Sequence, residues 1–435
     1  MPTLVTTVFG LVVIGYVAMS HRLDRWHVTA PLVFTLVGAV AGWQAGLHAE
    51  PSLVHNVAEV TLALILFHDA ALVRPRQLRS DASLCARLLL VGLPLTVLAG
   101  YAVARLLMPG IGTWLALLMA AALAPTDAGL GAATVLSPHV PVRTRRILNV
   151  ESGLNDGLAT PVVLFAIAAA GGTGTGSHGT IGAAVRELAV GVAVGVVVGA
   201  GSGRLLSYTR RTTRLAPGLL GIGTLAVPFA GYYGSVELHG NGFVAAFVSG
   251  TAFAAGFAAH AARTDTHRDL DDEGPLALTA MGSTALGYVV WSLFGAVAVA
   301  HLHSTWQGLL FAVLSLTALR MVPVALALAG SGLRLPTVVF LGWFGPRGLA
   351  SVVFALIAVE ALPTSAELET VIGTMSVTVL LSVVLHGVTA EPGARRYGDW
   401  VDRTQPVEEL RDSVEPAAGR GRLHRVHAIG TDARD

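Results

Sequence analysis

The apolar stretch ALLMAAALAPTDAGLGAATVL carries a carboxylate, Asp127, directly after Pro125 and Thr126 near its middle. Proline removes a helical hydrogen-bond donor and clashes with the preceding turn, and Gly129 and Gly131 loosen the segment further. We therefore predict a helix that is broken in mid-membrane, with free backbone carbonyls beside a carboxylate. A simple proline kink is the alternative, but a kink does not explain an aspartate at that depth.

The next apolar stretch contains four polar side chains within six residues, Glu151, Ser152, Asn155 and Asp156. A helix entering the membrane near Arg145 would place Asp156 about 17 Å along its axis, near the midplane of a hydrocarbon core about 30 Å thick. Ionisable groups at that depth are costly, face the bundle interior and usually have a function. We expect Asp156 to hold a proton or an ion. For Glu151 a structural network between helices is the favoured interpretation.

Two arginines in apolar stretches can balance these negative charges. Arg320 lies in LTALRMVPVAL and is a candidate partner for Glu151. Arg347 lies in GWFGPRGLASVVF, where Pro346 and two glycines again interrupt the helix, and it can act as a fixed positive charge there. The two interrupted spans are seven spans apart, so they cross the membrane in opposite directions. Discontinuous helices in two inverted halves indicate the ion site of a transporter.

A further carboxylate, Asp69, ends the apolar stretch LALILFHDAAL. It lies nearer the cytoplasmic end of its span than the centre, so it can line an ion funnel. A hydrated carboxylate at the interface is an equally weighted alternative. His68 can relay protons or simply be hydrated at the helix end, and Glu59 in the same span has no assigned role.

The composition explains where these residues must lie. Hydrophobic residues make up 53% of the 435 residues and charged residues only 13%, whereas a soluble domain carries about 25% charged residues. The mean hydropathy is +0.67. The deficit of charge excludes a soluble globular enzyme, and the net charge of +1 gives no reason to expect nucleic acid. One cysteine, Cys85, permits no internal disulfide; no metal-binding spacing is present and no cofactor is expected.

A membrane-spanning helix needs roughly 20 apolar residues, and this measure predicts an all-α polytopic membrane protein with about thirteen spans. The expected spans are 3–19, 29–47, 52–73, 85–108, 112–137, 145–170, 183–206, 215–234, 241–260, 276–301, 306–330, 335–360 and 367–390. Residues 1–390 therefore form the membrane domain. The polar residues 391–435 are expected to be a disordered cytoplasmic tail.

Arginines alternate between the loops in a way that predicts orientation, because cytoplasmic loops collect basic residues. They follow every second span, as Arg22 and Arg25; Arg74, Arg76 and Arg79; Arg143, Arg145 and Arg146; Arg210, Arg211 and Arg214; Arg263 and Arg268; and Arg334. The loops between carry none. This pattern places the N-terminus outside and the C-terminus in the cytoplasm.

Six segments follow one another over most of the apolar region: LFHDAAL, APTDAGLG, VPVRTRRILNVESGLNDG, NGFVAAFVSG, the Arg320 segment and GWFGPRGLAS. In these segments the chain resembles bacterial cation/proton antiporters of the NhaP/NHE branch. The resemblance implies that Asp156 is the ion-binding carboxylate and Asn155 its orienting neighbour. It also implies that Thr126, Asp127 and Ser152 complete the shell around the cation.

The same resemblance implies an ion pair between Glu151 and Arg320. It further implies a homodimer in the plasma membrane, with a mobile core (about 85–170 and 306–390) and scaffold helices (about 1–73 and 183–301). Many relatives place a glutamate near the position of Asp69, and this chain differs from them there.

One mechanism unites these observations. A buried carboxylate such as Asp156 can hold either a proton or a monovalent cation, and this competition makes the exchange obligatory. The bundle then exposes the site to each side in turn. Na⁺ is the expected cation, with Li⁺ and K⁺ open, and the exchange is expected to be electroneutral. The alternatives are a K⁺/H⁺ antiporter of the same fold and a cation channel, although no repeated filter motif is present. No enzyme motif is found at a suitable place either.

Overall fold

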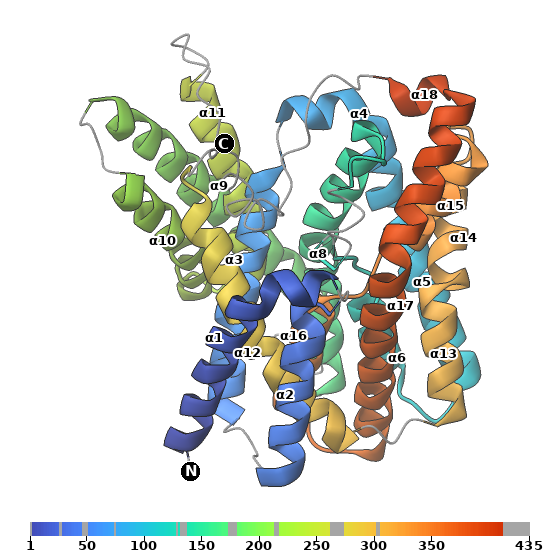
Figure 1. Cartoon of the computed structure of the whole chain (residues 1–435). Helices are drawn as coiled ribbons and strands as arrows, with labels where there is room; N and C mark the ends of the chain where they lie inside the picture. The colour runs from blue at the N-terminus through green and yellow to red at the C-terminus, as the bar shows by residue number, and fades with distance from the viewer. Residues whose placement is uncertain are drawn as a thin grey trace, which may run out of the picture.

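A computed structural model describes residues 2–25, 28–45, 51–73, 75–127, 129–130, 137–172, 181–212, 217–261, 274–301 and 305–411. All regular elements in these ranges are helices (Figure 1). By length and composition, seven helical stretches in the described part of the chain are long and apolar enough to cross a membrane. The expectation of an all-helical protein with many membrane spans is therefore confirmed.

The helices follow the expected spans in order. The first half contains α1 (Pro2–Arg25), α2 (Ala30–Ala45), α3 (Pro51–Leu72), α4 (Pro75–Arg87), the π-helix η1 (Leu88–Gly92), α5 (Leu93–Leu107), α6 (Thr113–Ala122) and α8 (Val142–Ala170). The second half contains α9 (Ile181–Thr212), α10 (Pro217–Glu237), α11 (Gly242–Ala261), α12 (Ala277–His301), α13 (Trp306–Leu316), α14 (Ala318–Ala327), α15 (Leu335–Trp343), α16 (Leu349–Ala361), α17 (Ala366–Thr404) and α18 (Val407–Leu410).

Two of the spans are broken where proline and glycine predict it. The helix α6 ends at Ala122, and the chain runs without helical structure to Asp127. The span formed by α15 and α16 is interrupted between Trp343 and Leu349. The two breaks touch, because the Asp127 N–H donates a hydrogen bond of 2.8 Å to Pro346 O. Residues 131–136, expected in the second half of the fifth span, lie outside the described ranges.

A third interruption was not expected from the sequence. The span predicted over 306–330 is two helices, α13 and α14, separated at Thr317, whose φ of −117° and ψ of −98° are not helical. The fourth span also differs from expectation, because helical structure begins at Pro75 and passes through η1 before α5.

The helices form two groups with α3, α12 and α16 between them (Figure 1). On one side α9, α10 and α11 pack together. On the other side α13 and α14 pack against α5, α17 packs against α6, and α15 packs against α14 and α17. Small residues allow close packing, as membrane helices require. A Cβ atom on Gly38 of α2 would lie 1.7 Å from Ser292 O of α12, so these two backbones are in direct contact.

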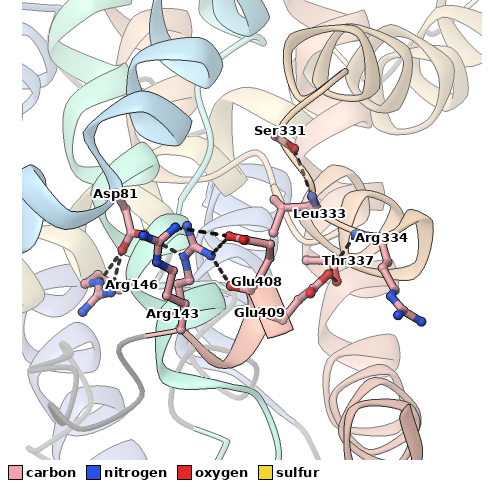
Figure 2. A network of polar contacts seen from close by, with 10 residues as sticks. Asp81, Arg143, Arg146, Ser331, Leu333, Arg334, Thr337, Glu408 and Glu409 are labelled. Carbon is pink, nitrogen blue, oxygen red and sulfur yellow. Dashed lines mark hydrogen bonds and ion pairs between the residues drawn. The ribbon is translucent and has the colours of Figure 1, made fainter. Parts of the chain in front are cut away.

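Helical structure at the C-terminal end extends further than expected. The boundary predicted at residue 391 falls inside α17, which continues to Thr404. The short helix α18 then folds back, and Glu409 is only 1% exposed. Its Oε1 accepts hydrogen bonds of 2.8 Å from Arg334 N and from Thr337 Oγ1 (Figure 2). Polar composition alone suggested disorder, but these polar groups bind one another. The rest of the expected tail, residues 412–435, lies outside the described ranges.

An ion network joins α4, the start of α8 and α18 (Figure 2). Asp81 of α4 accepts from Arg143 Nε at 2.8 Å and from Arg146 Nε at 2.7 Å. Arg143 reaches α18 as well, with Nη1 3.2 Å from Glu408 Oε2. The start of α8 is therefore fixed to its neighbours, about 20 Å along the helix from Asp156 at 1.5 Å per residue.

Candidate ion-binding site

Asp127 joins the two broken spans through its side chain. Its Oδ2 accepts a hydrogen bond of 3.1 Å from Leu349 N, the first residue of α16, and its Oδ1 accepts one of 2.7 Å from Gly129 N. The first N–H groups of a helix have no partner within the helix, and an aspartate there satisfies them and the helix dipole. Asp127 thus caps α16 while it belongs to the segment that follows α6.

The side chain of Arg347 binds the backbone carbonyls at the first break. The side chain is fully buried, and its Nη1 donates to Ala124 O at 2.7 Å and to Pro125 O at 3.2 Å. Its Nη2 donates to Ser315 O at 3.1 Å, next to the break at Thr317. These carbonyls lose helical partners at the breaks, and a cation is favourable at the carbonyl end of a helix. The fixed positive charge expected at Arg347 therefore lies where three carbonyls face it.

Ser152 and Asn155 of α8 hold the broken segment against that helix. Ser152 Oγ donates to Thr126 O at 2.8 Å, and Asn155 Nδ2 donates to Thr126 Oγ1 at 2.7 Å. Because its amide nitrogen faces Thr126, the carbonyl oxygen Oδ1 of Asn155 is left available. This buried Oδ1 has no hydrogen-bond partner among the described residues.

Asp156 lies beside this cluster and lines a cavity. The residue is 5% exposed, and its carboxylate makes no hydrogen bond or ion pair within the described part of the chain. The cavity has a volume of about 280 Å³ and is lined by Asp156, Asp127, Asp69 and His68, together with residues of α12 such as Tyr288 and Trp291. A buried carboxylate that faces an accessible cavity can take up a proton or a cation.

The structure brings Glu151 and Arg320 together. Arg320 Nη1 lies 2.7 Å from Glu151 Oε1, and both residues are 2% exposed. The pair connects α8 with α14, the helix that begins after the Thr317 break. Asp156 is more than one helical turn further along α8, so the pair lies beside the candidate site and not within the cavity lining.

Asp69 and His68 lie where α3 meets the cavity. Both residues line it, and both are buried. His68 Nδ1 lies 2.9 Å from Thr279 Oγ1 of α12, so it bonds to a neighbouring helix. Asp69 thus lines the same cavity as Asp156.

The sequence reasoning missed several supporting residues. Ser351 Oγ donates to Ala122 O at 2.6 Å, and Ser382 Oγ accepts from Arg347 N at 2.7 Å. Ser351 could have been identified from the sequence, because it is the last residue of GWFGPRGLAS, the segment that contains the second break. Ser382 lies four residues before His386, whose Nε2 is 2.9 Å from Trp343 O. Two polar side chains at this spacing in an apolar helix would have indicated a buried polar contact.

A second missed cluster lies at the opposite end of α3 from Asp69. His55 Nε2 is 3.0 Å from Glu59 Oε1, and His55 Nδ1 is 2.8 Å from Glu360 Oε2 of α16. Tyr232 OH of α10 donates to Glu59 Oε1 at 2.8 Å. Glu59, which had no role in the sequence analysis, thus belongs to a polar contact between α3, α10 and α16.

We expect Gly348→Ala to disrupt the contact between the two breaks. A Cβ atom at this position would lie 2.1 Å from Asp127 Oδ2, so Asp127 must leave the N-terminus of α16. Overpacking of this kind costs about 1–3 kcal/mol, and we expect a lower melting temperature in detergent and loss of most ion exchange. Gly387→Ala is the matched control, because nothing lies within 4 Å of a Cβ there. Equal behaviour of the two variants would contradict the assigned role of Asp127.

Comparisons with known proteins agree with this geometry. Residues 8–395 match the family described as "Sodium/hydrogen exchanger, transmembrane". The uncharacterized Na⁺/H⁺ exchanger YjcE of Escherichia coli (strain K12) is 27% identical over 249 residues, which are 56% of this chain and 45% of that protein. The chain therefore matches somewhat less than half the length of this curated relative.

The fold is that of a solved antiporter. The structure of the sodium proton antiporter MjNhaP1 from Methanocaldococcus jannaschii at pH 8 has a TM-score of 0.71 and 17% identity, over 91% of this chain and 99% of that chain. A structure from an electron microscopy map of the same antiporter has a TM-score of 0.65 and 18% identity, over 91% and 98% of the two chains.

The family match covers most of the chain and agrees with the expectation of a transporter family and not of an enzyme. The matched region includes both breaks, α8 and the cavity, so it contains all the residues of the candidate site. The chain belongs to the sodium/hydrogen exchanger family.

Proposed function

We propose that the protein exchanges one Na⁺ for one H⁺ across a bacterial plasma membrane, with Asp156 as the shared binding group. One observation carries this proposal. Asp156 is buried and lines a cavity of about 280 Å³, and its carboxylate makes no hydrogen bond within the described part of the chain. Any occupant that neutralises this charge is stabilised there, and a proton and a cation compete for the same oxygens.

The surrounding oxygens support a monovalent cation as the second occupant. Hard cations prefer oxygen ligands, and Asn155 Oδ1 is a buried oxygen that accepts no hydrogen bond from the described residues. Thr126 O and Oγ1 each accept one hydrogen bond, and an oxygen of either type has a second lone pair. Asp127 lines the cavity and contributes negative charge, although its oxygens also bind Leu349 and Gly129.

The cavity and the polar contact at the other end of α3 support alternating access. Ala30 and Pro31, the first residues of α2, line the cavity. In the proposed topology, with the N-terminus outside, this end of α2 faces the cytoplasm. The cluster of His55, Glu59 and Glu360 then lies on the external side and joins α3 to α16. We propose that the core (about 85–170 and 306–390) moves against the remaining helices, and that the protein is a homodimer.

We expect the exchange to be electroneutral. Position 155 is Asn and not a second acid, and Asp127 is engaged with backbone N–H groups, so one carboxylate titrates during the cycle. In proteoliposomes with Na⁺ as the substrate, a membrane potential imposed with a potassium ionophore should not drive uptake. Accumulation driven by the potential would show that a second proton, most simply that of Asp127, also moves.

The choice of cation is tested in the same proteoliposomes. A pH gradient is imposed and Na⁺, Li⁺ and K⁺ are added in turn while the internal pH is recorded. We expect Na⁺ to dissipate the gradient at the lowest concentration. A response to K⁺ alone would identify a K⁺/H⁺ antiporter. Cation flux that needs no counterflow of protons would indicate a channel and would overturn the proposal.

A further inference from the structure

An aromatic groove lies on the outer face of α15 and α17, away from the candidate ion site. Its volume is about 600 Å³, and it is lined mainly by apolar and aromatic side chains. The lining includes Phe340 and Trp343 of α15, Phe344 directly after it, and Val388 and Trp400 of α17. The two helices lie at the edge of the helix bundle (Figure 1), so the groove opens toward lipid in a membrane protein.

The walls of the groove are held in place by ring contacts and a small residue. Phe340 stacks on Tyr397, with centroids 4.2 Å apart, and Tyr397 stacks on Trp400 at 5.7 Å. Phe344 packs against Gly393 so closely that a Cβ atom there would lie 2.5 Å from its Cζ. The groove is therefore a formed feature of the two helices and not a gap between mobile side chains.

One charged side chain lies at the groove, Arg396. It is exposed and makes no ion pair among the described residues. Its neighbour in sequence, Arg395, contacts Glu391 in an ion pair. Arg396 is thus the group in the groove lining that can attract an anion, since the other lining residues carry no formal charge.

The position of Arg396 along α17 corresponds to the lipid headgroups. The helix starts at Ala366, with Glu367 and Glu369 in its first turn, and Arg396 follows about 45 Å later at 1.5 Å per residue. A bilayer with its headgroups is about 40–45 Å thick. Val388 lies about 12 Å before Arg396, within the hydrocarbon. The groove therefore runs from the acyl-chain region to the headgroup region, where tryptophan and tyrosine are favoured.

We propose that this groove binds an anionic glycerophospholipid of the leaflet at the C-terminal end of α17. An acyl chain would lie along Val388, Trp343 and Phe344, and the phosphate would contact the Arg396 guanidinium. Arginine suits a phosphate because its planar N–H groups can form two parallel hydrogen bonds. A basic group near anionic lipid also gains attraction from the surface charge of the membrane.

Native mass spectrometry of the full chain in detergent tests this site. Phosphatidylglycerol and phosphatidylcholine with identical chains are added in turn, and the bound fraction is measured. We expect the wild type to prefer phosphatidylglycerol, and Arg396→Gln to bind it roughly tenfold more weakly, as for the loss of one charge-assisted contact. Arg395→Gln is the matched control, because it removes the same charge one residue away and outside the groove; it should bind as the wild type does.

A second variant tests the contribution of the groove separately from that of the Arg396 charge. Val388 is 66% exposed, and Val388→Trp fills the groove without changing the charge, so it should weaken binding of both lipids. Equal losses in Arg395→Gln and Arg396→Gln would show a general surface charge effect and would overturn the site. Equal binding of the two lipids by the wild type would overturn the role of the phosphate. Because these measurements need no transport, they stand apart from the proposed exchange.

Discussion

Replacing Asp156 by asparagine is expected to abolish cation-driven proton movement, down to the rate of protein-free liposomes. Asparagine keeps the size of the side chain but removes both the negative charge and the titratable proton. The buried carboxylate makes no hydrogen bond within the described part of the chain, so the substitution breaks no contact there, and the protein should remain folded. The measurement is exchange in proteoliposomes under an imposed pH gradient, with the melting temperature recorded in parallel.

The matched control for Asp156 is Asp69→Asn, which removes a carboxylate from the same cavity lining. If Asp69 only lies on the route to the site, its variant should retain exchange at high Na⁺ concentration and show a higher apparent KM. Substantial exchange by Asp156→Asn would contradict the assignment of Asp156 as the carrier of the proton and the cation. Loss of exchange only in Asp69→Asn would transfer the role of carrier to Asp69.

The second large effect concerns Glu151 and Arg320. Each is 2% exposed, and they form an ion pair of 2.7 Å between α8 and α14. Removing one member of a buried pair costs about 3–5 kcal/mol, because the other charge is left uncompensated, whereas replacing both can be nearly neutral. Glu151→Gln and Arg320→Met should therefore lower the melting temperature in detergent more than the double substitution does.

The double variant should also recover part of the exchange that each single change loses, because neither residue carries the ion. A double-mutant cycle provides the control, since effects of independent residues simply add. Additive losses would show that the two residues are not partners. Arg320 would then act through its charge on the ion site, and the structural role of the pair would be wrong.

Much of the fold follows from properties that are local in sequence. The thickness of the bilayer fixes the length of a span, so hydropathy located the spans in order. Proline removes a helical hydrogen bond, and Pro125 and Pro346, each with glycines close by, indicated the two breaks. Proline alone is not sufficient, because Pro161 lies inside the continuous helix α8. The same reasoning placed Asp127, Asp156 and Arg347 inside the membrane. These predictions need no knowledge of what each residue touches.

The features that were not predicted depend on contacts between distant segments. Neither glycine nor proline occurs at the break at Thr317, where Ser315 O accepts from Arg347, 32 residues later in the sequence. The hydrogen bond from Leu349 N to Asp127 likewise joins residues 222 positions apart. The helical structure after residue 391 rests on partners such as Arg334 and Thr337. No local pattern specifies these pairings, so the sequence alone could not show them.

The contacts of Arg347 also constrain the order in which the protein can assemble during synthesis. The helices α15 and α16 have 9 and 13 residues, so neither is long enough to span the hydrocarbon alone. An arginine at the centre of an inserting segment costs about 2.5–3.5 kcal/mol on insertion scales. Its acceptors, Ala124, Pro125 and Ser315, all precede it in the chain. The ribosome therefore delivers the acceptors to the membrane before the arginine, and the interrupted span of α15 and α16 enters a bundle that already contains the partners of its charge.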